Sequence, residues 1–311
     1  MKPAPFDYFA PATVDGALSL LREHGSAAKV LAGGQSLVPA MNFRLAQPAI
    51  LIDLNNIPDL AYIRPAGDGG LALGAMTRDS SAEHSSLVAE RAPLIPAVMP
   101  FVAYPAIRNR GTVGGALAHA DPSGQLPAVA VALSARCRVR SKARERWVPA
   151  DEFFVGFFAT ALDHDELLVE VQIPPLPPES GWGYRQVERQ VGAGALVGVA
   201  AVVTLDRQRR CANSRIVLLS VGEGPVRAAR AAASLAGQAP SPEAIAAAAD
   251  LAARSDIDPG GDIHASPAFR RHLAAVLTRQ ALTDAFGRAS KEPAPSSRSG
   301  GAPSAARGEL R

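Results

Sequence analysis

Two glycine-rich segments of the chain carry residue types that bind phosphate oxygens. The first is Ala32-Gly-Gly-Gln-Ser-Leu37, which follows a short apolar run that begins at Lys29. A glycine pair lets the backbone turn sharply and approach a ligand closely, and consecutive N–H groups in such a turn form an anion-binding concavity. The Ser36 hydroxyl adds a donor, so the candidate residues are Ala32, Gly33, Gly34, Gln35, Ser36 and Leu37. An ordinary Gly-Gly hairpin turn would explain the same pattern.

The second segment is Gly111-Thr-Val-Gly-Gly-Ala-Leu117, which is followed by Ala118-His-Ala-Asp121. Thr112 is a side-chain donor, and Asp121 is placed to accept a hydrogen bond from a sugar hydroxyl. The two loops together could hold the two phosphates of a dinucleotide through the N–H groups of Gly33, Gly34, Gly114 and Gly115. The candidate residues in the second segment are Gly111, Thr112, Val113, Gly114, Gly115 and Asp121. Neither segment has the glycine spacing of a Rossmann or P-loop fingerprint.

Short helices and strands must position these loops. Apolar spacing predicts a helix at 13–24, capped by Thr13 or Asp15 and ended by Gly25. A hairpin is expected at 61–76, because glycines separate two strand-like runs there. The other expected elements of this region are helices at 77–91 and 94–102, an apolar segment at 126–135, and strands at 49–54, 136–140, 146–148 and 167–173.

A proline cluster, Ile173-Pro-Pro-Leu-Pro-Pro178, divides the chain, because prolines continue neither a helix nor a central strand. We therefore expect one domain at 1–176 and an α+β domain at 177–286, in which strands precede helices. The strands are expected at 182–189, 196–207 and 214–221, and the helices at 226–235, 242–254 and 268–286. Residues 287–311 contain no aromatic or β-branched residue and are expected to be a disordered tail.

Composition excludes several classes of function. Aromatic residues make up 5% of the 311 residues and the net charge is +3, which disfavours a base-stacking nucleic-acid surface. The 2 cysteines, Cys137 and Cys211, cannot provide the four thiolates of an iron–sulfur cluster. The 6 histidines are scattered without a metal-binding spacing. No apolar run approaches the ~20 residues of a membrane span and no secretory signal is visible, so we expect a cytoplasmic protein.

The two glycine segments resemble those of the FAD-binding subunit in the xanthine dehydrogenase and carbon monoxide dehydrogenase family of molybdenum hydroxylases. The first resembling stretch is AGGQSLVPAMNFRLA at 32–46, and the second is AIRNRGTVGGALAHADP at 106–122. Three further stretches resemble the family in the same order: DEFFVGFFATAL at 151–162, DELLVEVQIP at 165–174 and YRQVERQVGAGALVGVAA at 184–201. The resemblance covers nearly all of the chain up to residue 286.

The resemblance implies the fold of a vanillyl-alcohol-oxidase-type FAD-binding domain. Two α/β subdomains, divided near residue 58, would hold the cofactor, and a smaller α+β domain would follow. The FAD is expected to be non-covalent, because Gln35 stands where relatives with covalent FAD carry histidine and an amide is not a nucleophile.

The resemblance also implies two partner chains. A large subunit would carry molybdopterin and a small subunit two [2Fe-2S] clusters, assembled as a dimer of heterotrimers. Electrons would pass from the clusters through FAD to an external acceptor. The chain itself would hydroxylate nothing, so no catalytic residue and no metal ligand is assigned to it.

Three positions depart from the family pattern. Ala116 replaces an asparagine after the second glycine pair, and Gln125 replaces an acid. Gly192-Ala-Gly-Ala195 replaces a Gly-Asp-aromatic-Ala motif, whose aromatic residue often lies near the isoalloxazine ring. Either that space is open in this chain or another residue fills it.

Other interpretations remain. A self-contained FAD oxidoreductase of the same fold would need its own catalytic acid or base, and a basic binding protein would need no flavin. Gly222-Glu-Gly-Pro-Val-Arg227 is part of a dinucleotide fingerprint or the start of a helix. His119 is a proton carrier or a packed loop histidine, and Arg108 neutralises a phosphate, bridges subunits or is solvated.

Overall fold

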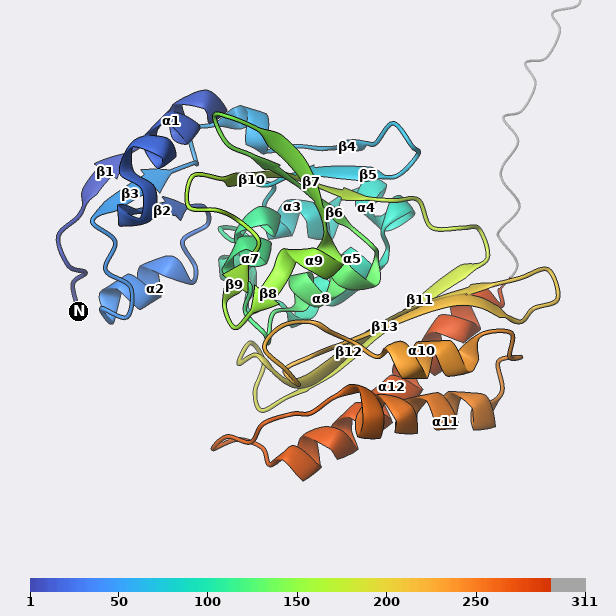
Figure 1. Cartoon of the computed structure of the whole chain (residues 1–311). Helices are drawn as coiled ribbons and strands as arrows, with labels where there is room; N and C mark the ends of the chain where they lie inside the picture. Colours follow the sequence, from blue (N-terminus) through green and yellow to red (C-terminus); the bar gives the residue numbers. More distant parts are fainter. Residues whose placement is uncertain (292–311) are drawn as a thin grey trace, which may run out of the picture.

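The computed structural model describes residues 1–291 (Figure 1). The predicted tail began at residue 287, but the last helix, α12 (Pro267–Ala289), continues to Ala289. It does so because Ala289 is buried and packs closely on Gly181 of the C-terminal sheet. A Cβ on Gly181 would collide with the Ala289 backbone nitrogen, so only a glycine lets this last turn of the helix approach. The remainder of the predicted tail, 292–311, lies outside the described residues.

The N-terminal unit is a parallel sheet of three strands with the order β1-β3-β2. Its strands are β1 (Asp7–Phe9), β2 (Ala28–Leu31) and β3 (Ile50–Asp53), and its helices are α1 (Val14–His24), η1 (Gly25–Ala27), α2 (Leu37–Asn42) and η2 (Pro58–Leu60). The Thr13 hydroxyl accepts from the Gly16 N–H at 3.1 Å, and Gly25 ends α1 with φ +52°, as the sequence predicted. Leu18 and Leu21 on α1 pack on Ile52 of β3.

The second unit is built on a five-stranded sheet with the order β4-β5-β10-β6-β7, in which every neighbouring pair is antiparallel. The strands are β4 (Ile63–Pro65), β5 (Leu71–Gly74), β6 (Arg136–Arg140), β7 (Glu145–Pro149) and β10 (Leu167–Ile173). The predicted hairpin at 61–76 is confirmed as β4 and β5. A small antiparallel hairpin, β8 (Phe154–Gly156) with β9 (Ala159–Thr160), stands between β7 and β10 in the chain.

Short helices cover one side of the five-stranded sheet. They are α3 (Asp79–His84), α4 (Ser86–Arg91), α5 (Leu94–Val98), η3 (Met99–Phe101), α6 (Pro105–Arg108), α7 (Val113–His119), α8 (Gln125–Ala132) and α9 (Ala150–Phe153). The single helix expected at 77–91 is two helices, because Ser85 is extended and its hydroxyl caps α4 through the Val88 N–H. The predicted apolar segment at 126–135 forms most of α8.

The C-terminal unit is an antiparallel sheet with the order β11-β12-β13-β14, covered by helices. Its elements are β11 (Ser180–Glu188), β12 (Ala195–Leu205), β13 (Cys211–Leu219), β14 (Val226–Arg227), α10 (Ala229–Leu235), α11 (Pro242–Leu251), η4 (Ala252–Asp256) and α12. The helix expected from residue 226 begins only at Ala229, because Val226 and Arg227 pair with β13 as an edge strand.

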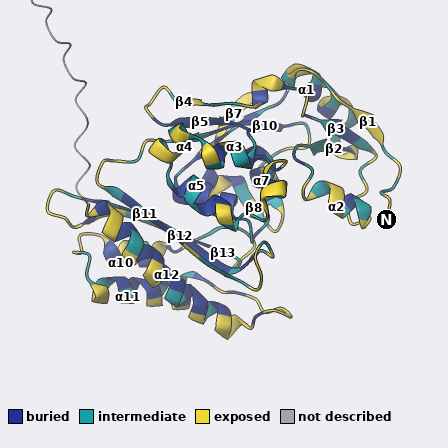
Figure 2. Cartoon of the chain, turned by 180° about the vertical axis from the view of Figure 1, so that it is seen from behind, coloured by how far each residue is buried: buried dark blue, intermediate teal, exposed yellow. Residues whose placement is uncertain are grey.

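The central strand β12 explains how the units join. Val197, Val199 and Val203 pack with α10 to α12, whereas Ala200 and Val202 belong to the core of the second unit. Side chains of a strand alternate between faces, so a strand buried on both faces reads as a continuous apolar run. The chain therefore stacks in layers from the five-stranded sheet through α3–α9 and β11–β13 to α10–α12 (Figure 1), and buried residues follow the strands of both sheets (Figure 2).

Candidate cofactor-binding site

The structure brings the two glycine-rich segments into direct contact. A Cβ on Gly33 would collide with the Arg110 carbonyl oxygen and would lie 2.8 Å from the Gly111 Cα atom. A Cβ on Gly115 would lie 3.3 Å from that of Ala32. Because contacts this close leave no room for a side chain, the glycines at these positions allow the two loops to meet.

The first loop links β2 to α2 and leaves its backbone donors free. Gly34 adopts φ +74°, a conformation that glycine accepts without strain. The backbone N–H groups of residues 33–37 have no hydrogen-bond acceptor within the described part of the chain, and the Ser36 hydroxyl does not cap α2. Gln35 donates from Nε2 to the Gly33 carbonyl oxygen at 3.0 Å. A row of free donors on a tight turn fits the oxygens of a diphosphate.

The second loop uses its backbone donors inside the protein. The N–H of Val113 donates to the Thr77 carbonyl oxygen at 2.9 Å, and that of Gly114 donates to the Ala75 carbonyl oxygen at 2.8 Å. The Gly115 N–H donates to Oγ1 of Thr112 at 3.1 Å, which caps α7. The expectation that Gly114 and Gly115 turn free N–H groups toward a ligand is therefore wrong. Carbonyl oxygens in the loop after β5 already accept from Val113 and Gly114.

Gly114 has a packing role instead. A Cβ at this position would lie 2.5 Å from the Ala75 Cβ and 2.6 Å from the Ala75 carbonyl oxygen. The glycine thus lets α7 lie directly on the end of β5. The hydroxyl of Thr112, a buried residue, accepts from Gly115 and donates to no atom of the described residues.

Two polar residues that no motif in the sequence indicated connect the loops. Asn55 donates from Nδ2 to the Ala32 carbonyl oxygen at 2.9 Å, and Arg78 donates to Oδ1 of Asn55 at 2.6 Å. Arg78 also donates to the Arg110 carbonyl oxygen, so it contacts both sides of the site. In the sequence, only their positions could have indicated these two residues. Asn55 follows β3 and Arg78 follows β5, at the strand ends where ligands commonly bind.

Asp121 and His119 lie at the other end of α7. Asp121 accepts with Oδ1 from both the N–H and the hydroxyl of Ser123, each at 2.8 Å, which closes a local turn. The His119 ring packs against Phe158 with 4.9 Å between ring centroids. Burial lowers the pKa of His119. This environment is that of a packed loop histidine, one of the two predicted roles.

The structure also excludes roles that the sequence had suggested for Arg108 and for residues 222–227. Arg108 is buried and paired with Glu83 at 2.8 Å, so it is neither solvated nor free to neutralise a phosphate. Residues 222–227 do not open a nucleotide-binding helix, because Val226 and Arg227 form β14. Arg227 pairs with Asp151 at 3.3 Å.

Comparison with known proteins agrees with this geometry. Residues 4–176 match the family model of the FAD binding domain in molybdopterin dehydrogenase, and residues 182–285 match that of the CO dehydrogenase flavoprotein C-terminal domain. The chain belongs to the FAD-binding medium subunits of the molybdenum hydroxylases. The predicted family and the mixed α/β fold with its C-terminal domain are thereby confirmed.

Members of this family are similar to the chain over almost its full length. The alpha subunit of the 6-hydroxypseudooxynicotine dehydrogenase complex of Paenarthrobacter nicotinovorans is 39% identical, over 93% of this chain and 97% of the relative. The carbon monoxide dehydrogenase medium chain of Hydrogenophaga pseudoflava is 38% identical, over 93% and 99%. A solved structure of the enzyme from that organism has a TM-score of 0.89, at 38% identity and with coverage of 93% and 99%. Quinoline 2-oxidoreductase from Pseudomonas putida 86 has a TM-score of 0.87 at 36% identity, with coverage of 93% and 99%.

The medium-subunit fold accommodates the departures noted in the sequence. Gln125 is buried and donates to the Phe101 carbonyl oxygen at 3.1 Å and to Gln186 at 3.2 Å. At the β11–β12 turn, the Tyr104 hydroxyl donates to the Val191 carbonyl oxygen at 2.7 Å. A Cβ on Gly192 would lie 3.0 Å from the Tyr104 ring. An aromatic ring thus packs beside the turn that lacks the family's own aromatic residue.

The remaining reactive groups do not form a second centre. Cys137 and Cys211 are both buried, and burial raises the pKa of the Cys137 thiol to about 12. Residues 1–291 contain no group of three His, Cys, Asp or Glu residues arranged to hold a metal ion. In the same range, no helix has both the length and the apolar character needed to cross a membrane.

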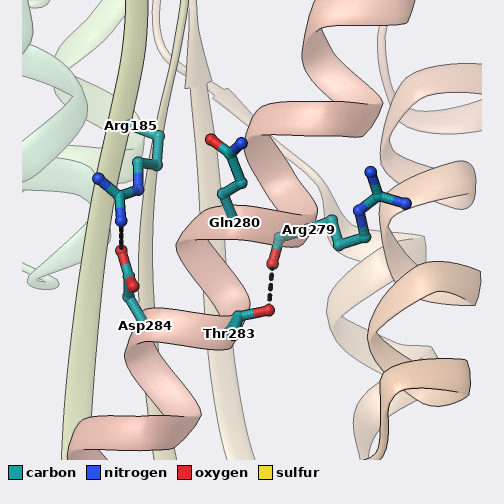
Figure 3. A pocket seen from close by; sticks show the side chains of 5 residues that line it. All are labelled: Arg185, Arg279, Gln280, Thr283 and Asp284. Carbon is teal, nitrogen blue, oxygen red and sulfur yellow. Dashed lines mark hydrogen bonds and ion pairs between the residues drawn. The ribbon is translucent and has the colours of Figure 1, made fainter.

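A cavity of about 500 Å³ lies between β11 and α12 (Figure 3), and none of the residues that line it belongs to the glycine loops. Arg185 and Asp284 form an ion pair of 2.7 Å across it, and the Thr283 hydroxyl donates to the Arg279 carbonyl oxygen at 2.8 Å. These contacts are internal to the C-terminal unit, so the cavity is a surface hollow separate from the loops.

Proposed function

We propose that this chain is the FAD-binding electron-transfer subunit of a heterotrimeric molybdenum hydroxylase. Its redox partners would be a small subunit with two [2Fe-2S] clusters, which delivers electrons, and a large subunit with molybdopterin, where the substrate is hydroxylated. Two such heterotrimers would form the complete enzyme. The names of the relatives support this assignment, because they describe a medium chain and a subunit of a dehydrogenase complex.

The observation that carries the proposal is the row of free N–H groups at residues 33–37, held against the second loop. These groups and the Ser36 hydroxyl would hold the diphosphate of FAD. The Thr112 hydroxyl would donate from the opposite side, and Arg78 would add a positive charge. Asp121 would accept from a ribose hydroxyl with Oδ2, because Oδ1 accepts from Ser123. The remaining predicted residues would shape the site by packing: Ala32, Gly111, Val113, Gly114 and Gly115.

FAD supplies a redox-active ring that exchanges electrons with its neighbours. The residues of this chain would bind and orient the cofactor. Gln35 is no nucleophile and its amide is held by Gly33, so attachment would be non-covalent. His119 packs on Phe158 and does not pair with an acid in the manner of a catalytic base. The chain would therefore oxidise no organic substrate by itself. The two buried, separate cysteines suit a reducing compartment, and we place the protein in the cytoplasm.

Purification of the full chain alone and with its two proposed partners tests the proposal. The chain alone should show the visible absorbance of bound flavin and keep it when substrates of molybdenum hydroxylases are added. The reconstituted complex should lose that absorbance on addition of substrate, and removal of the iron–sulfur subunit should prevent the loss. If the isolated chain reduces its own FAD with an organic substrate at enzymatic rates, the self-contained oxidoreductase is correct.

A further inference from the structure

Asp79 is a buried acid directly behind the second glycine loop. It opens α3, and its backbone N–H donates to the Gly111 carbonyl oxygen at 3.1 Å. A Cβ on Gly111 would collide with Oδ2 of Asp79, so this carboxyl group packs on Gly111 without a gap. Gly111 in turn touches Gly33 of the first loop. A single residue therefore separates the acid from the loop with the free donors.

The carboxyl group of Asp79 lacks the partners that a buried charge requires. Asp79 is 4% exposed, and Oδ1 is buried without a hydrogen-bond partner in the described residues. The two nearest cations are engaged elsewhere, since Arg108 pairs with Glu83 and Arg78 donates to Asn55 and Arg110. An unpaired buried charge costs far more free energy than an unpaired neutral group.

The other elements around Asp79 supply no further compensating charge. Glu83, on the same helix, is negative, and α5 and η3 carry no titratable residue. On α4, Arg91 donates to the carbonyl oxygens of Gly69 and Gly70 and lies near Glu90. Burial raises the pKa of Asp79 to about 7, with a smaller contribution from Glu83, although Arg108 and Arg78 lower it.

We propose that Asp79 is a positioning residue of the cofactor site, which supports Gly111 against the first loop as a neutral acid and weakens FAD binding when it ionises. This inference rests on the proposed function. An ionised carboxylate behind Gly111 would repel the diphosphate and would draw water into the packed contact. Diphosphate in turn disfavours the ionised form, so FAD binding and protonation of Asp79 strengthen each other.

The pH dependence follows from the sign of this coupling. Below about pH 7 the acid is neutral and the dissociation constant of FAD is constant. Above this pH the dissociation constant rises, by up to about tenfold for each pH unit, because each binding event must take up a proton. Since the folded chain also holds this proton more tightly than the unfolded chain, stability should fall as the pH rises from about 4 to about 7.

The test is a titration of the full chain, depleted of FAD, with FAD at about pH 6 to 8.5, followed by flavin fluorescence. We expect the dissociation constant of the wild type to rise more than about tenfold over this range. Asp79→Asn should remove the rise and bind at every pH as the wild type does at pH 6. Asp59→Asn, which changes an exposed acid on η2, should keep the wild-type profile.

The outcomes separate the inference from the proposed function. A flat wild-type profile overturns the inference whether or not any variant folds, as does an Asp79→Asn variant with the wild-type rise. Asp79→Thr, a smaller neutral side chain, provides a second variant. If the folded wild type binds no FAD at any pH, the proposed function itself is wrong.

Discussion

In the first glycine loop, the N–H groups of residues 33–37 find no acceptor among residues 1–291, whereas in the second loop Val113, Gly114 and Gly115 donate to Thr77, Ala75 and Thr112. Both loops contain a glycine pair, which precedes the short helix α2 in the first and lies in the first turn of the short helix α7 in the second. In the first segment Gly33 lets the second segment approach and the neighbouring N–H groups stay without an acceptor, whereas in the second Gly114 lets a helix pack on a strand. A glycine pair in a sequence therefore shows that something approaches the backbone, but the fold decides what approaches.

The largest effect that tests this contrast is expected from Gly114→Ala. The added Cβ would lie 2.5 Å from the Ala75 Cβ, with the Ala75 backbone just behind it, so α7 must shift. We expect the free energy of unfolding to fall by about 3 kcal/mol, as for an overpacked core. Urea denaturation of the full chain measures this change.

Gly287→Ala is the matched control for this substitution. It lies in α12 with no atom within 4 Å of the added Cβ. Alanine is the better helix former, so stability should rise by up to about 1 kcal/mol. If Gly114→Ala is as stable as wild type and loses only FAD, the second loop is a ligand loop after all, and the contrast fails.

Ser36→Ala in the first loop is expected to have a smaller effect, which falls on FAD affinity and not on stability. The Ser36 side chain is exposed and does not cap α2, so the stability of the FAD-free chain should not change. The loss of one hydrogen bond to a charged phosphate, about 1.5 kcal/mol, should raise the dissociation constant of FAD about tenfold. Fluorescence titration measures it.

Ser19→Ala controls for the loss of an exposed hydroxyl. Ser19 lies on α1 and donates only to the Asp15 carbonyl oxygen. Its substitution should leave FAD affinity at the wild-type value. Equal affinities for wild type and Ser36→Ala would remove Ser36 from the proposed diphosphate site.

Much of the fold could be predicted because many elements carry their own signal. Strands β6 and β10 have the predicted bounds, since alternating or apolar runs are bordered by turn residues. Strand β1 was missed, because its three residues are exposed and only parallel pairing with β3 makes them a strand. Helix α8 was recognised only as apolar, because all of its residues are buried and no amphipathic period remains.

The site was predictable only in its glycine pattern. Which N–H groups are free depends on the carbonyl oxygens of Ala75 and Thr77, which follow β5 and are distant in sequence. Asn55, Arg78 and Asp79 were not selected for the same reason. Each is an ordinary polar residue after a strand until the fold places it beside a loop.

The smallest predicted effect concerns Thr112, whose hydroxyl group caps a helix and would also bind the cofactor. Its oxygen accepts from the Gly115 N–H as the cap of α7, and its hydrogen, which has no acceptor among the described residues, would donate to a phosphate in the proposed site. Thr112→Val removes both, so the free energy of unfolding should fall by about 1 kcal/mol and FAD should bind several-fold more weakly. Denaturation and fluorescence titration report the two changes separately.

Thr112→Ser keeps the hydroxyl and should restore both properties almost completely. The pair of variants therefore sharpens the contrast between the loops. If valine changes only stability, the second loop is purely a structural element, and diphosphate binding rests on the first loop alone. If it changes only FAD affinity, the cap observed between Thr112 and Gly115 does not stabilise α7, and the second loop binds the cofactor as the first one does.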